Sequence, residues 1–137
     1  MNLNINMPAY YTREYGVIDE IYIMCKEISE SVRNNKYSEV VDTIGITPIV
    51  APKEKISIGL WKERNECEVK YGFVSVSLWI DYEHFIESDI AEKKKLVLEN
   101  ILRSIKVISK RAKLDKEALI NDIRLSYQEE GIDVLKL

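Results

Sequence analysis

Hydrophobic and polar positions alternate at the start of the chain and then change to a helical spacing. Asn residues alternate with Leu3, Ile5 and Met7, the period-two pattern of a strand with one buried face. From residue 17 to residue 33 the apolar positions recur every three or four residues, which is typical of an amphipathic helix. We therefore expect a strand over residues 2–7 followed by a helix over residues 17–33.

Three further strands are expected between residues 43 and 81. The first covers residues 43–50, and Pro48, which cannot donate a backbone hydrogen bond, places this strand at a sheet edge or beside a bulge. The second and third cover residues 55–64 and 68–81, and the short Asn-Glu-Cys segment between them predicts a hairpin. A hairpin pairs its strands in opposite directions, so the sheet is predicted to be mainly antiparallel.

The two faces of the predicted hairpin differ in character. One face carries aliphatic side chains such as Val76 and needs helices packed against it. The opposite face combines small and hydroxylated residues with aromatic side chains, which are Trp61, Tyr71, Phe73 and Trp79. We expect this second face to be partly solvated or to be covered by the terminal segments.

The C-terminal half of the chain is predicted to contain two helices. Apolar residues at helical spacing from Val97 onward form the buried stripe of a long helix that begins near Asp89. Asp115 caps a shorter helix that runs to Gly131. The chain is therefore expected to be a single α+β domain over residues 1–137. Its predicted fold is a mainly antiparallel sheet of four or five strands with helices packed on one face, in the order β-α-β-β-β-α-α.

Composition supports a globular cytoplasmic protein. The chain has 137 residues, of which 46% are hydrophobic and 31% charged. Its apolar runs are shorter than the roughly 18 residues needed to cross a membrane, and the N-terminus lacks the features of a secretory signal. In the cytoplasm Cys25 and Cys67 are expected to stay reduced. The net charge of −3 argues against a nucleic-acid partner.

Charge is distributed unevenly along the second half of the chain. Residues 81–92 contain five acidic residues and no Lys or Arg, whereas residues 93–113 contain eight Lys and Arg and one Glu. The basic residues follow the polar side of an amphipathic helix, so a solvated face is their simplest interpretation.

The acidic residues divide into two groups. Asp89 and Glu92 are explained by the start of a helix, where carboxylates cap free backbone N–H groups and interact favourably with the helix dipole. Asp81, Glu83 and Glu87 are not needed for that purpose. Together with Asp89 they form a candidate surface for a basic partner.

His84 is the only histidine of the chain. Its proximity to Asp81 and Glu83 in the sequence would be compatible with a general base or a metal ligand. Adjacent positions rarely converge on one point, however, and no second His or Cys is placed to complete a metal site. We therefore interpret His84 as a surface or capping residue. The recognisable nucleotide-binding, zinc-protease and hydrolase motifs are absent, so the sequence supplies no candidate catalytic residue, metal ligand or cofactor.

Residues 61–111 resemble a known family. The matching motifs are SLWIDYEHF at residues 77–85, ESD at 87–89 and LENILRSI at 98–105, and KYSEVVDTIGITPIV at 36–50 is also similar. They resemble the small cytoplasmic immunity proteins of bacterial polymorphic toxin systems, including those of contact-dependent growth inhibition.

The resemblance implies a non-enzymatic inhibitor that binds the C-terminal toxin domain of its cognate effector. Each member is matched to its own toxin, so the resemblance supplies no shared contact residues. Many of these toxins are basic nucleases, to which an acidic surface is complementary. The candidate partner-binding residues therefore depend on the charge and aromatic patterns alone, and they are Asp81, Glu83, His84, Glu87, Asp89, Trp61, Tyr71 and Trp79.

Two alternatives depend on the aromatic face of the predicted sheet. A small-molecule-binding or enzymatic α+β domain would use Trp61 and Trp79 to form its pocket, and a metabolite that raises the melting temperature would favour this alternative. A homodimer would pair the aromatic faces of two copies, which gel filtration over a range of concentrations would detect.

Overall fold

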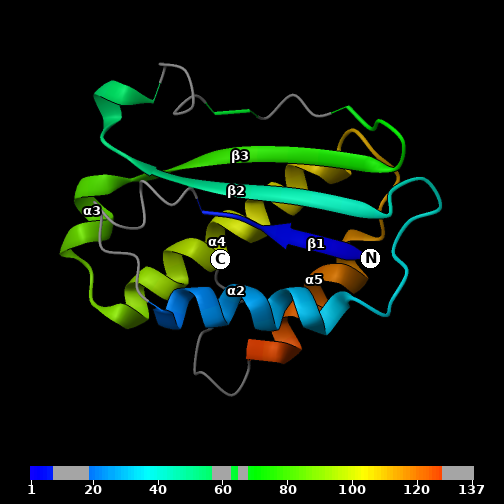
Figure 1. Ribbon diagram of the computed structural model, residues 1–137, viewed down its shortest axis with the longest axis horizontal. Helices are drawn as coiled ribbons and strands as arrows, with labels where there is room; N and C mark the ends of the chain where they lie inside the picture. The colour runs from blue at the N-terminus through cyan, green and yellow to red at the C-terminus, as the bar shows by residue number, and fades with distance from the viewer. Residues whose placement is uncertain (8–18, 57–62, 65–67, 128–137) are drawn as a thin grey trace.

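The computed structural model describes residues 1–7, 19–56, 63–64 and 68–127. Among these residues no helix combines the length and the apolar character needed to cross a membrane. The elements follow one another along the chain as shown in Figure 1, and they are β1 (Asn2–Ile5), α2 (Asp19–Val32), β2 (Thr43–Ala51), the 3-10 helix η1 (Lys53–Lys55), β3 (Phe73–Asp81), α3 (Tyr82–Glu87), α4 (Ile90–Ser109) and α5 (Lys116–Tyr127).

The strands form a parallel sheet, so the predicted mainly antiparallel sheet of four or five strands is wrong. Within the described residues the sheet has three strands in the order β1-β2-β3, and both pairings are parallel. The sequence pattern located strands but not their partners. Where the structure describes the chain, antiparallel pairing consists of two isolated bridges at the outer edge of β3, Arg64 with Ser77 and Lys70 with Phe73. Arg64 and Lys70 therefore lie antiparallel to their partners in β3. The chain then turns at Tyr71 and Gly72 and enters β3, which runs parallel to β2.

The turn into β3 differs from the predicted one. The Asn-Glu-Cys segment, residues 65–67, lies outside the described residues. The described turn is formed by Tyr71 and Gly72, and the flanking residues Lys70 and Phe73 exchange both of their backbone hydrogen bonds, each at 2.9 Å. The strand predicted over residues 68–81 is thus divided into a short returning segment and β3.

Pro48 lies in the central strand and not at a sheet edge, one of its two predicted positions. Asn6 donates a backbone hydrogen bond of 2.9 Å to the carbonyl of Ile46, so the even-numbered backbone groups of β2 point towards β1. The β1–β2 pairing ends at Ile46. The Pro48 nitrogen therefore points to a position beyond this pairing, where the ladder needs no donor.

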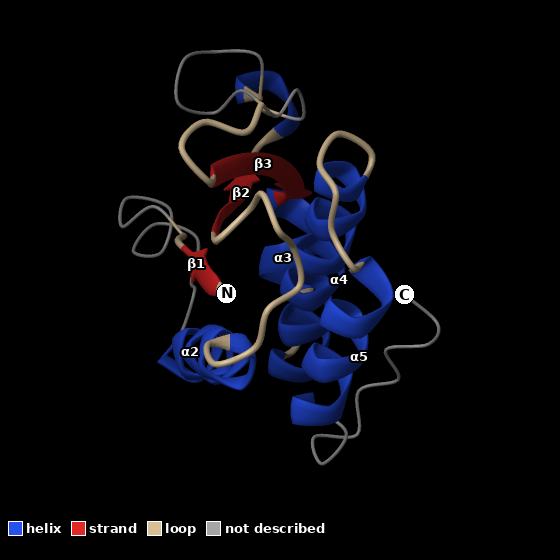
Figure 2. Ribbon diagram, turned by 90° about the vertical axis from the view of Figure 1, so that its right-hand side faces the viewer, coloured by secondary structure: helices blue, strands red, loops and turns tan. Residues whose placement is uncertain are grey.

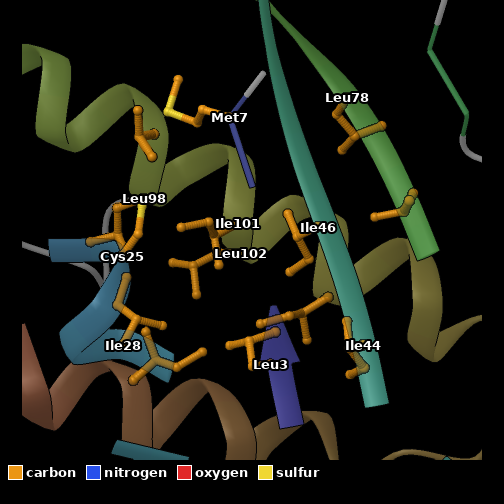
Figure 3. Close-up of a cluster of buried hydrophobic side chains, with 14 of the residues drawn as sticks. Leu3, Met7, Cys25, Ile28, Ile44, Ile46, Leu78, Leu98, Ile101 and Leu102 are labelled. Carbon is orange, nitrogen blue, oxygen red and sulfur yellow. The ribbon is translucent and has the colours of Figure 1, made fainter. Parts of the chain in front are cut away.

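Helices α2, α4 and α5 lie on one face of the sheet (Figure 2). Helix α4 packs against β2 and β3, α2 packs against β1, and α5 packs against α2 and α4. Figure 3 shows Leu3, Ile44 and Ile46 of the sheet pointing towards Ile28 of α2 and Ile101 of α4. All five side chains are almost completely buried. Burial of an aliphatic side chain of this size stabilises a fold by about 1.5–3 kcal/mol.

The opposite face of the sheet has the mixed character that the alternation predicted. The strand register aligns Asn4, Gly45 and Ser75 in one row across the three strands. Asn4 and Ser75 are exposed, and Phe73 is 44% exposed. A Cβ atom on Gly45 would lie 3.3 Å from Cζ of Phe73, so the glycine leaves room for the Phe73 ring to lie across the strand.

Cys25 is a buried free thiol on the inner side of α2. Cys67, the other cysteine of the chain, lies outside the described residues. Burial raises the pKa of the Cys25 thiol from 9.0 to about 12. A thiol reacts with alkylating agents as its thiolate, so the folded state should protect Cys25 from them.

We predict that a Cys67→Ser variant resists iodoacetamide at pH 8 and reacts rapidly in concentrated urea, as followed by mass spectrometry. Because the unfolded thiol ionises near pH 9 and the folded thiol near pH 12, its contribution to stability is complete below pH 9 and lost as the pH rises through that interval. Rapid alkylation without denaturant would contradict the buried placement of Cys25.

Candidate functional site

The acidic residues gather where β3 continues into α3 and α4. Asp81 is the last residue of β3, Glu83, His84 and Glu87 belong to α3, and Asp89 immediately precedes α4. This region lies at the carboxyl end of the parallel sheet, at the left of Figure 1. We call Asp81, Glu83, Glu87 and Asp89 the acidic end.

The four carboxylates of the acidic end have two kinds of surroundings. The Asp89 side chain accepts a hydrogen bond of 2.9 Å from the backbone N–H of Glu92, and it caps α4 as predicted. Asp81 caps α3 in the same way through a longer contact of 3.4 Å with the N–H of Glu83. The side chains of Glu83 and Glu87 are exposed to solvent. Two carboxylates therefore stabilise helix starts, and two extend into solvent.

His84 lies on the surface of α3, in agreement with the sequence interpretation. Its Nε2 atom is 3.9 Å from Oε1 of Glu92, and both side chains are exposed to a large extent. Among the described residues no group of three His, Cys, Asp or Glu side chains could hold a metal ion. His84 therefore contributes to the polar surface beside the acidic end.

A pocket of about 230 Å³ adjoins the acidic end, between β3, α3 and α4. It brings together three of the predicted residues, Trp79, Asp81 and His84. It also includes Glu99 and Arg103, which sequence reasoning assigned only to the solvated side of α4. Their spacing of four residues was the available signal, because such residues lie on the same side of a helix.

Trp79 is held in place by hydrogen bonds of its backbone and its indole ring. Its indole Nε1–H donates a hydrogen bond of 2.8 Å to the carbonyl of Ala51, and its backbone N–H donates one of 2.8 Å to the Glu63 carboxylate. The Trp79 carbonyl accepts a bond of 3.3 Å from Nη2 of Arg103. These contacts fix the half-buried Trp79 as one wall of the pocket.

The LENILRSI motif fixes α4 against β3. Asn100 is fully buried, and its Nδ2 donates a hydrogen bond of 2.9 Å to the carbonyl of Leu78. Ser104, also buried, donates one of 2.8 Å to the carbonyl of Asn100. Asn100 therefore has a structural role, because it joins the helix that begins at the acidic end to β3, whereas the Ser104 bond lies within α4.

The predicted aromatic residues do not join the acidic end as a group. Tyr71 is fully exposed at the opposite end of β3. This strand has nine residues, which corresponds to a length of roughly 25–30 Å. Trp61 lies outside the described residues. The structure thus divides the candidate residues between the two ends of one strand.

The capping geometry predicts different costs for two neighbouring substitutions. Asp89→Ala should lower the free energy of unfolding by about 1 kcal/mol, because it leaves the N–H of Glu92 without its cap. Glu87→Ala, at an exposed position, should change it by less than about 0.5 kcal/mol. Urea denaturation of both variants measures the difference, and equal stabilities would show that the cap contributes little.

Comparison with known families places the chain in a functional class. Residues 1–129 match the model of the family described as Immunity protein 44. The match defines the chain as a toxin immunity protein and confirms the resemblance seen in the sequence. The chain belongs to the Immunity protein 44 (Imm44) family. Searches of curated proteins and of solved structures gave no match.

Proposed function

We propose that this protein binds and neutralises the C-terminal toxin domain of a cognate contact-dependent growth inhibition effector. The family match over residues 1–129 is the observation that carries the proposal. Inhibition requires only that the bound protein cover a surface that the toxin needs, so no catalysis is invoked. We place the encounter in the cytoplasm, where the toxin would otherwise act on the cell that produces it.

The acidic end is proposed as the surface that captures the toxin. Its two exposed glutamates lie within one short helix, α3, and the Asp81 and Asp89 caps add negative charge on either side. A concentration of like charge attracts a surface of opposite charge and accelerates association. The complementary partner is a basic toxin domain, such as a nuclease with a phosphate-binding surface.

The proposed function predicts a specific rescue of growth. The C-terminal domains of the secreted effectors of the same genome would each be expressed in a test bacterium, with and without this protein. We expect rescue from one toxic domain and from no unrelated toxin, together with a stable complex on gel filtration. If the protein protected the cells from none of these domains, the proposal would be refuted.

Reversal of charge at the acidic end should slow association with the domain identified in this way. The double variant Glu83→Lys/Glu87→Lys is expected to lower the association rate constant about tenfold at low ionic strength, and less in 0.5 M salt, because salt screens exposed charges. Stopped-flow kinetics at several salt concentrations would measure the effect. Asp81 and Asp89 are left unchanged because they cap helices.

Glu27→Lys/Glu117→Lys is a matched control for the double variant. Both glutamates are exposed and lie outside the acidic end, and the change in net charge is the same. A reduction of equal size in both double variants would show that net charge matters and that the acidic end does not. Unchanged association at low ionic strength would likewise remove the acidic end from the interface.

A further inference from the structure

We propose that the turn at the start of β3 presents Tyr71 as an anchor that inserts into an apolar pocket of the toxin domain. This inference rests on the proposed function and names a second contact, at the end of β3 opposite to the acidic end. Four features of the turn support it: its backbone conformation, its rigidity, the exposure of its aromatic residues, and its distance from the acidic end.

The backbone of Tyr71 has an unfavourable conformation. Tyr71 and Gly72 have φ angles of 53° and 78°, and both lie in the left-handed region. Two-residue hairpin turns with positive φ at both positions favour Asn-Gly or Asp-Gly, because most other side chains are strained there. A tyrosine at the first position of this turn is therefore unfavourable, and the backbone conformation does not explain why a tyrosine is present there.

Packing gives no reason for the tyrosine either. Tyr71 is fully exposed, with a relative accessibility of 105%, so its ring stabilises no core. Two other apolar residues are also exposed. Phe73, the first residue of β3, is 44% exposed, and Val40, which precedes β2, is 50% exposed. An exposed aromatic residue in a strained conformation is better explained by contact with another molecule.

The turn that carries Tyr71 is rigidly held. Its Gly72 carbonyl accepts hydrogen bonds from the backbone N–H groups of Asp42, at 2.9 Å, and of Thr43, at 3.1 Å. A Cβ atom at position 72 would lie 2.7 Å from Oδ2 of Asp42, so any other residue would have to displace that side chain as well as adopt the positive φ angle. A ring fixed on such a turn loses little backbone freedom when it binds, which favours its use as an anchor.

One toxin domain is large enough to contact both ends of β3. A specific interface covers about 800 Å² on each partner, a patch roughly 30 Å across. Tyr71 and the acidic end are separated by the length of this one nine-residue strand. Charge at one end would then accelerate capture, and a desolvated tyrosine, a residue enriched among binding hot spots, would slow dissociation.

Substitution at Tyr71 should affect affinity and stability in different directions. The toxin domain in this test is the one that the growth-rescue experiment identifies. Tyr71→Asn is expected to weaken binding to this domain roughly 10- to 30-fold, mainly through faster dissociation. The urea midpoint of the free protein should stay equal or rise, because Asn tolerates the left-handed region. Tyr71→Phe should retain most of the affinity, since it keeps the ring. Surface plasmon resonance and urea denaturation would measure the two quantities.

Tyr22→Ala is the matched control, since Tyr22 is an exposed tyrosine of α2, and its removal should leave the affinity unchanged. An unaltered affinity of Tyr71→Asn for a toxin that the wild-type protein binds would overturn this inference alone. A lower urea midpoint of Tyr71→Asn would also overturn it, by assigning Tyr71 a structural role. If the wild-type protein binds no toxin domain, the proposed function and this inference both fail.

Self-association is the competing use of the same aromatic turn. Gel filtration of the free protein over a range of concentrations would show a dimer that Tyr71→Asn abolishes. That result would assign the turn to a second copy of this chain and would overturn the inference. A monomer at all concentrations, together with weaker toxin binding by the variant, would support it.

Discussion

The parallel pairing of β2 with both of its neighbours is the constraint on which the rest of the structure depends. Parallel neighbours cannot be joined by a tight turn, so the chain must cross over between β1 and β2 and again between β2 and β3. The first crossover contains α2, which helps to close the core. The second includes Arg64 and Lys70, which form antiparallel bridges with residues of β3. The same constraint places the carboxyl ends of the strands at one side, where α3 and α4 begin.

The acidic end combines helix capping and exposed negative charge in one short stretch of chain. Asp81 and Asp89 bind free backbone N–H groups at two helix starts, and their charge interacts favourably with the helix dipoles. The exposed Glu83 and Glu87 add negative charge beyond that of the two caps. Asn100 holds α4 against β3, so these charges are presented on a fixed framework. A framework that does not move on binding lowers the entropic cost of association.

Much of the local structure could be predicted from the sequence because it depends on neighbouring residues. The period of the apolar positions predicted β1, α2, β2 and α4, and the side chain of Asp89 marked the start of α4. The clustering of Asp81, Glu83 and Glu87 followed from their proximity along the chain. Helix α3 was not predicted, because its six residues are too few to establish a helical period. The pocket that Glu99 and Arg103 line together with Trp79 was not predicted either, because it depends on the packing of α4 on β3.

The division between the two levels follows the range of the interactions. The sequence by itself determined the positions of β1, α2, β2 and α4, their buried faces and the concentration of acidic charge, since these depend on spacing and on residue type. Only the tertiary structure decided that the sheet is parallel, that Pro48 lies in its central strand, and that Tyr71 and the acidic end occupy opposite ends of β3. These features depend on which distant segments exchange backbone hydrogen bonds, and a period of two is the same for a strand with parallel or antiparallel neighbours.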